Sequence, residues 1–260
     1  MLSSLMRTFT PTTYAPILAA QVPYPLLFAS VSGAHLYGFP SPDSDVDLRG
    51  CHVLPLTLLL GIDEPPATVT HMWQVDGVEV DLVSHDLKKF ATLLERQHGN
   101  FLEQLFAPTV VVDTPWAAEL RAIVRQGGIG RHVYHAYAGF ARAQWQEWRK
   151  GARQGGGQLK ALLYAYRVVL TGIHVLTSGE VNANLADLAP LYGLPQLLDL
   201  VAAKSAEHVV VDVPMDEHDR RMVELLARLD EAYQASPLPP TPTNRVALND
   251  FVVRVRLALG

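Results

Sequence analysis

The spacing of apolar and polar positions changes near residue 112 of the chain. Before that point the apolar runs are short, spanning Leu26–Val31 and Val46–Val53, and Asp76-Gly77 separates two alternating segments within Thr68–Val83. Short apolar runs with turn residues at their ends are typical of buried strands, and Asp-Gly between alternating segments favours a tight hairpin. The first part of the chain is therefore predicted to contain a sheet.

A helical repeat of apolar residues dominates from Thr114 onward. Thr114-Pro115 is a typical helix start, because a threonine hydroxyl caps the first turn and proline fits its first position. Asp86 has the same capping role for an earlier helix, and Asn100 would either cap a short helix or contact substrate. The predicted helices span residues 87–96, 116–125, 133–149, 159–176 and 245–259, with GARQGGGQ (151–158) as a flexible connector.

These elements predict an α+β fold, in which a mixed sheet with flanking helices is followed by an all-helical C-terminal domain. The chain has 260 residues, of which 49% are apolar and 18% charged, so it is long and apolar enough to form a real core. No apolar run is expected to reach the length needed to cross a membrane, and prolines interrupt the N-terminal apolar stretch. We therefore expect a cytoplasmic protein with no membrane partner.

The chain is acidic, with a net charge of −5 at pH 7 and a pI near 6.0. This argues against a broad basic surface for nucleic acid, so any RNA contact is expected to be local. Cys51 is the single cysteine, which rules out a disulfide within the chain and fits a reducing compartment. Its thiol is either a nucleophile or a small buried residue.

The candidate chemistry lies in residues 31–50, VSGAHLYGFPSPDSDVDLRG. Asp45 and Asp47 are two residues apart, so on a strand their carboxylates would point to the same face. Two carboxylates with substrate phosphates make a good Mg²⁺ site, and the small residues around Gly33 let backbone N–H groups approach a phosphate. Taken alone, the D-x-D pair would also fit a solvated turn.

The order of these features resembles the active-site signature of the DNA polymerase beta-type nucleotidyltransferases. The longer pattern, G-A-H-L-Y-G followed by P-D-S-D-V-D-L-R-G, is most similar to the RNA repair pathway DNA polymerase beta family. The resemblance implies a nucleotidyltransferase catalytic domain at residues 1–112 and a helical domain at 113–260 that closes the nucleotide and substrate cleft. The chain departs from the pattern at Ala34, where glycine or serine is usual, and Ser32 would supply the hydroxyl instead.

The resemblance also implies roles for single residues. Asp45 and Asp47 would bind metal together with a third carboxylate, Asp81, on the strand after the hairpin. Glu79 shares the face of Asp81 and competes for this position. The implied two-metal site takes Mg²⁺, with Mn²⁺ as a substitute. The implied phosphate-binding turn consists of Ser32, Gly33 and Ala34, with His35 beside it.

Two further groups of residues are candidates for nucleotide binding. Arg49 shares the strand face of the two aspartates, where it would pair with a carboxylate in the empty site or contact a phosphate. Lys160, Tyr164 and Arg167 recur at i, i+4 and i+7, so they share one helix face. That face would meet the phosphates and base of a nucleotide, as superfamily members often use such a helix, or it is a solvated stripe.

The expected reaction is Mg²⁺-dependent transfer of a nucleoside monophosphate from an NTP to a hydroxyl acceptor, with release of pyrophosphate. The acceptor is an RNA 3′ end in RNA repair, a protein side chain or a small molecule. A different possibility is a catalytically inactive binding module that keeps the fold, and the three aspartates argue against it. The preferred NTP and the oligomeric state stay open.

Overall fold

A computed structural model of the protein describes residues 11–75, 77–153, 159–206 and 214–260. Contacts group the chain into two compact units. The first unit comprises residues 1–33, 43–128 and 242–260, and the second comprises residues 34–42 and 129–241. The domain boundary implied at residue 112 stays a prediction.

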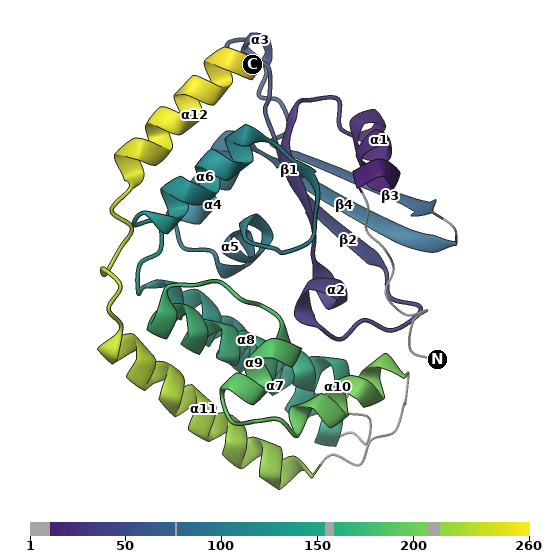
Figure 1. The fold of residues 1–260 in the computed structure, drawn as a ribbon, viewed down its shortest axis with the longest axis vertical. Coiled ribbons are helices and arrows are strands. Elements are labelled where there is room, and N and C mark those ends of the chain that lie inside the picture. Colours follow the sequence, from purple (N-terminus) through teal and green to yellow (C-terminus); the bar gives the residue numbers. More distant parts are fainter. Residues whose placement is uncertain (1–10, 76, 154–158, 207–213) are drawn as a thin grey trace. The chain divides into compact units, whose positions relative to one another are not determined.

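In the described residues of the first unit, five strands form one mixed sheet in the order β3-β4-β2-β1-β5 (Figure 1). The pair β2–β4 is parallel, and the other neighbouring pairs are antiparallel. The α+β class predicted from the sequence is confirmed. The strands span Leu26–Val31 (β1), Val46–His52 (β2), Thr68–Val75 (β3), Val78–Asp86 (β4) and Val110–Asp113 (β5).

One face of the sheet packs against helix α1 (Pro11–Gln21). Leu18 of this helix and Val22, which directly follows it, join apolar residues of β1, β2, β4 and β5 in one cluster. The cluster comprises Leu18, Val22, Ala29, Val31, Val46, Leu48, Val80, Leu82 and Val111. Alternation along a strand directs the intervening side chains, among them Asp47, Arg49 and Asp81, to the opposite face.

That opposite face packs against α4 (Leu87–Glu95), α5 (Gly99–Leu105) and α6 (Pro115–Arg125) (Figure 1). Phe28 of β1 meets Phe90 of α4 edge-on, with 5.3 Å between the ring centroids. The sheet is therefore covered by helices on both faces, which is the layer arrangement that the sequence predicts.

The helix starts inferred from the sequence are partly confirmed. The side chains of Asp86 and Thr114 each accept a hydrogen bond from a backbone N–H of the helix that follows. Asn100, in contrast, lies inside α5, whose N-cap residue is His98. The predicted capping role of Asn100 is therefore wrong.

A buried ion pair ties the C-terminal helix, α12 (Arg245–Leu259), to the sheet. Arg256 Nη2 lies 2.6 Å from Asp86 Oδ2, and Nη1 of the same arginine donates to the carbonyl oxygen of Leu54 at 3.0 Å. Asp86 Oδ1 accepts a hydrogen bond from Leu54 N at 3.2 Å. The helix predicted at residues 245–259 is confirmed, and its contacts group it with the first unit.

The second unit is helical in its described residues, and most side chains of helix α8 (Leu159–Ser178) are buried. By length and composition α8 is the one helix of the described chain that reaches membrane-crossing length, so the expectation that no such run exists is wrong. Of that apolar window, 72% is buried inside the protein, as in the core helix of a folded domain. The helices of this unit span Val133–Arg153 (α7), Leu159–Ser178 (α8), Leu185–Leu191 (α9), Leu197–Ser205 (α10) and Met215–Ala235 (α11).

Several elements differ from the sequence-based prediction. The apolar pattern does not predict β5, α1, α9, α10, α11 or the short helices α2 (Gly33–Tyr37) and α3 (Leu56–Leu59). Helix α7 ends at Arg153, which lies within the expected connector, and residues 154–158 of that connector are outside the described residues. Asp76 of the hairpin turn is also outside them, but the antiparallel pairing of β3 with β4 confirms the hairpin.

Candidate active site

Two aspartates meet in the middle of the sheet because β2 and β4 are parallel neighbours. Asp47 of β2 is the register partner of Asp81 of β4, so the two carboxylates leave adjacent strands at the same level. Their side chains are 28% and 35% exposed. The sequence predicts both residues in one site, and the structure brings them together.

Arg49 joins the two carboxylates. Its Nη2 atom lies 2.6 Å from Asp47 Oδ1 and 3.0 Å from Asp81 Oδ2. Its Nη1 atom donates to the backbone carbonyl oxygens of Leu48 and Asp81, both at 2.9 Å. These contacts fix the guanidinium between two strands, where one positive charge stands between two negative ones.

Gly33 lies against the other oxygen of Asp47. Its φ is +61°, and a Cβ atom at this position would lie 1.8 Å from Asp47 Oδ2. The preceding residue, Ser32, donates its backbone N–H to the carbonyl oxygen of Asp47 at 2.8 Å. Glycine is required because its backbone is left-handed and no space remains for a side chain. The predicted phosphate-binding turn therefore lies against a predicted metal ligand.

The other predicted phosphate-binding residues, Ala34 and His35, lie in the short helix α2 (Gly33–Tyr37). The division between the two compact units also falls at this point, because residues 34–42 group with the second unit. The turn that contacts Asp47 is therefore also the point where the chain passes from one unit to the other.

Asp45 lies just before β2 and is exposed. Within the residues that the structure describes, no group of three or more His, Cys, Asp or Glu side chains could hold a metal ion. On β4 the carboxylate that contacts Arg49 is Asp81, whereas its competitor Glu79 is exposed near the hairpin end. The structure thus brings two of the implied carboxylates together, and the metal-binding role of Asp45 stays a prediction.

Three predicted nucleotide-binding residues lie on α8 in the second unit and differ in their surroundings. Lys160 is exposed, whereas Arg167 is 2% exposed. The Arg167 guanidinium carbon lies 3.9 Å from the ring centroid of Tyr37 and 5.7 Å from that of Tyr164. A solvated stripe is therefore wrong for Arg167, which is a cation held against aromatic rings. Sequence reasoning missed Tyr37, although it is part of the G-A-H-L-Y-G pattern.

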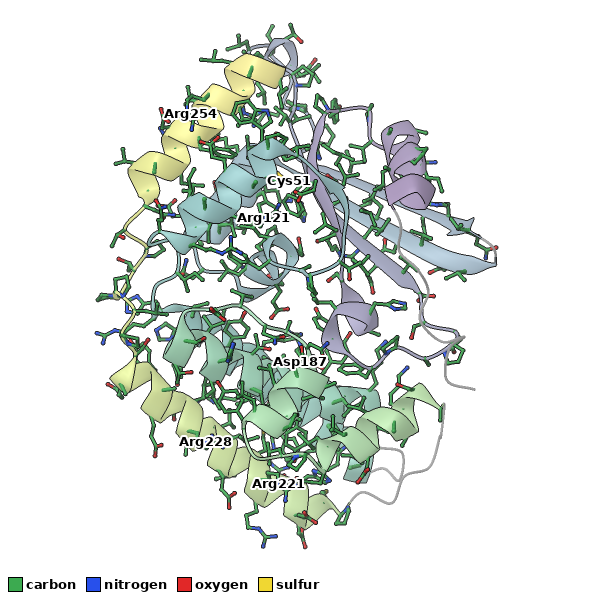
Figure 2. The ribbon with its side chains drawn as sticks, in the orientation of Figure 1. Cys51, Arg121, Asp187, Arg221, Arg228 and Arg254 are labelled. Carbon is green, nitrogen blue, oxygen red and sulfur yellow. The ribbon has the colours of Figure 1, made fainter. Side chains whose placement is uncertain are left out.

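Burial keeps neighbouring titratable groups uncharged. The pKa of His85 on β4 is lowered to about 4, mainly by burial and further by the positive charge of Lys89. Cys51 of β2 is fully buried (Figure 2), and this burial raises the pKa of its thiol well above the usual value. Cys51 is therefore a small buried residue, and the interpretation of its thiol as a nucleophile is wrong.

The mixed sheet, its helical cover and the paired strand aspartates define a nucleotidyltransferase-like α+β protein. More specifically, the chain belongs to the RNA repair pathway DNA polymerase beta family, whose model matches residues 14–254. The family inferred from the sequence pattern is confirmed. Among solved structures, a nucleotidyltransferase-like protein from Exiguobacterium sibiricum 255-15 is similar at 11% identity and a TM-score of 0.35, over 94% of this chain and 79% of that chain. No curated protein matches the chain.

Proposed function

We propose that the protein is a Mg²⁺-dependent nucleotidyltransferase that moves a nucleoside monophosphate from an NTP to a hydroxyl group at an RNA 3′ end. The observation that carries this proposal is the convergence of Asp47 and Asp81 on one cationic atom, Arg49 Nη2. Two carboxylates on neighbouring strands supply the oxygen ligands that Mg²⁺ prefers. The description of the family, RNA repair, supports RNA as the acceptor.

The residues present fit a magnesium ion. Mg²⁺ is usually bound through one or two carboxylates, with waters and substrate phosphates completing its shell. Asp47 and Asp81 would supply the carboxylates, and we assign exposed Asp45 as a further ligand. When bound, Mg²⁺ or Mn²⁺ would neutralise phosphate charge and stabilise the leaving pyrophosphate.

The chain's own groups would position the reactants. Backbone N–H groups of the turn Ser32-Gly33-Ala34 would bind the outer phosphates, since a glycine with positive φ opens the backbone to an anion. The acceptor hydroxyl oxygen attacks the α-phosphorus, the bond from that phosphorus to the bridging oxygen breaks, and pyrophosphate leaves with the bonding electrons. Arg49 contacts Oδ2 of Asp81, so we assign Oδ1 of Asp81 to accept the hydroxyl proton.

The test is transfer of label from each α-³²P-labelled NTP to RNA in the presence of Mg²⁺ or Mn²⁺. Asp47→Asn and Asp81→Asn remove a negative charge and keep the side-chain shape. Each should lower transfer by about a hundredfold or more, since even residues that only orient metal ligands typically contribute roughly 10- to 100-fold. Asp113→Asn is the matched control, because Asp113 lies on β5 of the same sheet and pairs at 2.5 Å with Arg121 of α6.

The outcomes separate the parts of the proposal. Label on RNA that depends on Asp47 and Asp81 but not on Asp113 supports it in full. Label on a protein or small molecule in a mixed acceptor panel would keep the transferase and replace RNA as acceptor. No label on any acceptor, with no metal-dependent NTP binding, would make the protein a binding module.

A further inference from the structure

A cluster of aromatic and basic side chains lies on the second unit, where the start of α7 meets the end of α11. We call it the Tyr134–Tyr233 surface. It has no part in the site described above. The cluster comprises Arg131, His132, Tyr134, His135, Arg142, Asp230 and Tyr233.

Two tyrosines form the centre of this surface. The rings of Tyr134 and Tyr233 are stacked, with centroids 4.6 Å apart and planes inclined by 26°. The ring of His135 lies 5.8 Å from that of Tyr233, and the guanidinium carbon of Arg131 lies 5.6 Å from the same ring. The surface thus combines adjacent aromatic rings with a cation over one of them.

Polar contacts hold the Tyr134 ring in place, and the Tyr233 ring stacks on it. The Tyr134 hydroxyl donates to Asp230 Oδ1 at 2.6 Å, and Arg142 Nη2 donates to the Tyr134 hydroxyl oxygen at 3.4 Å. Arg142 also pairs with Asp230 at 3.6 Å. Rings that are already fixed lose little conformational freedom when a ligand binds, so the surface is preorganised.

A second stacked pair in the same unit shows how such a stack serves the core. Trp145 and Trp148 stack with centroids 4.8 Å apart, and they are 6% and 2% exposed. Tyr134 and Tyr233 instead keep part of their surface in solvent, and the side chain of Asp230 is 54% exposed. A stack that stays at the surface beside charged groups is accessible to a further ring.

We propose that the Tyr134–Tyr233 surface binds unpaired bases of an RNA strand. This proposal rests on the proposed function, which names RNA as the acceptor. Proteins bind single-stranded nucleic acid by stacking its bases on aromatic side chains, with arginine beside the rings and positive charge along the backbone. Arg131 and Arg142 supply the cations for backbone phosphates.

The experiment measures the affinity of the full chain for a short fluorescent single-stranded RNA by anisotropy, without NTP. Tyr233→Ala should weaken binding about tenfold or more, because stacking on one aromatic side chain contributes on that order per base. Tyr233→Phe keeps the ring and should bind as the wild type does. His135→Ala and Arg142→Gln alter exposed side chains and should each weaken binding a few-fold.

The matched control is Tyr192→Ala, which removes the same side chain elsewhere in the second unit. Tyr192 is half-buried, the guanidinium carbon of Arg228 of α11 lies 5.7 Å from its ring centroid, and His174 Nδ1 lies 3.1 Å from its hydroxyl. The affinity for RNA should not change in this variant. With phosphate contacts from two arginines, the dependence of log affinity on log salt should have a slope of about −1.4.

The failure of this proposal is distinguishable from the failure of the proposed function. Equal RNA affinity of the wild type and a folded Tyr233→Ala variant would contradict RNA binding by the Tyr134–Tyr233 surface. A lack of RNA binding by the wild type would contradict it as well. Should Tyr233→Ala not fold, unchanged binding in both His135→Ala and Arg142→Gln overturns it instead. RNA binding that depends on Tyr233 without any label transfer supports the surface and overturns the transferase.

Discussion

Strand β4 carries two aspartates that each contact an arginine side chain, but the two pairs differ in burial and in hydrogen bonding. Asp86, at the end of the strand, is 3% exposed, and its carboxylate contacts Arg256 and two backbone N–H groups. Asp81, five residues earlier, has a side chain that is 35% exposed, and it shares Arg49 with Asp47. One charge is matched and fully hydrogen-bonded, whereas the other is one of two carboxylates on a single guanidinium.

The difference separates a charge that stabilises the fold from one that the proposed function uses. A buried charge is tolerated only when it is paired and hydrogen-bonded, so Asp86 serves to hold α12 on the first unit. An exposed pair contributes little to stability, because water screens its attraction. In the proposed function, Asp47 and Asp81 instead hold a cation, and that cation would attract the phosphates of the substrate.

Asp86→Ala should have the largest effect on stability. It leaves the guanidinium of Arg256 buried without its carboxylate and removes the cap of α4, so the free energy of unfolding should fall by about 3–5 kcal/mol. Urea denaturation measures this loss. Asp81→Asn should lower the same quantity by less than about 1 kcal/mol. Similar losses in the two variants would contradict the distinction between the two aspartates.

A double variant sharpens the same comparison. Asp86→Leu combined with Arg256→Met replaces the buried pair by apolar side chains, so no uncompensated charge remains. It should recover most of the stability that Asp86→Ala loses, because buried ion pairs are often replaced by well-packed apolar residues at little cost. A double variant as unstable as Asp86→Ala would show that the backbone contacts of Asp86, and not its charge, determine the loss.

The buried region should also make stability depend on pH. His52 lies 2.9 Å from Ser84 Oγ, and its pKa is lowered to about 4, mainly by burial. In the unfolded chain this pKa is near 6.5, so between these values the unfolded state binds a proton that the folded state does not. The contribution of His52 to stability is therefore complete above pH 6.5, and about 3 kcal/mol of it should be lost as the pH drops toward 4.

Urea denaturation across that pH range measures the slope. His52→Gln removes one titrating group and should flatten the curve, and the lowered pKa of His85, also about 4, accounts for the slope that remains. An unchanged slope in His52→Gln would mean that the region around Asp86 admits a protonated imidazole. The buried surroundings of Asp86 would then tolerate a positive charge that has no partner.

The sequence predicts these two regions unequally. The cap at Asp86, the helix at residues 245–259 and the strand that carries Asp47 are local features, and each has a local signal. The pairing of Asp47 with Asp81 depends instead on which strands become parallel neighbours across 34 residues of chain. Capping residues and apolar spacing do not encode that choice, so only the family resemblance pointed to it.

The remaining misses have the same physical origin. Strand β5 has four residues, too few for an alternating pattern to be recognised, and it is stabilised by pairing with β1. The helical spacing allows Arg167 to lie on a solvated face, but Tyr37, distant in the sequence, packs against its guanidinium and the side chain is buried. Both outcomes are set by tertiary contacts, which override the local pattern.

Gly33→Ala tests the contact that distinguishes Asp47 from an ordinary surface carboxylate. The left-handed backbone should cost about 1–2 kcal/mol of stability in alanine, and the new Cβ would displace Asp47 Oδ2. Gly77→Ala is the matched control, because Gly77 has φ +79° with no atom within 4 Å of its Cβ position. Both variants should lose similar stability, but only Gly33→Ala should lose label transfer. Full label transfer by Gly33→Ala would contradict the phosphate-binding role of the turn.

Arg49→Gln should change stability least and reveal the most about the site. Loss of its partly exposed ion pairs should lower the free energy of unfolding by less than about 1 kcal/mol without Mg²⁺. Mg²⁺ should then raise the melting temperature of this variant more than that of the wild type, because the ion no longer competes with the guanidinium. Arg121→Gln, which frees the single carboxylate of Asp113, should show no such gain.

Equal responses of Arg49→Gln and Arg121→Gln to Mg²⁺ would mean that two adjacent carboxylates bind the cation no better than a single carboxylate does. A larger rise in melting temperature for Arg49→Gln would show that Arg49 occupies the cation site before Mg²⁺ binds. Reduced label transfer by the same variant would show that Arg49 also contacts a phosphate once Mg²⁺ is bound.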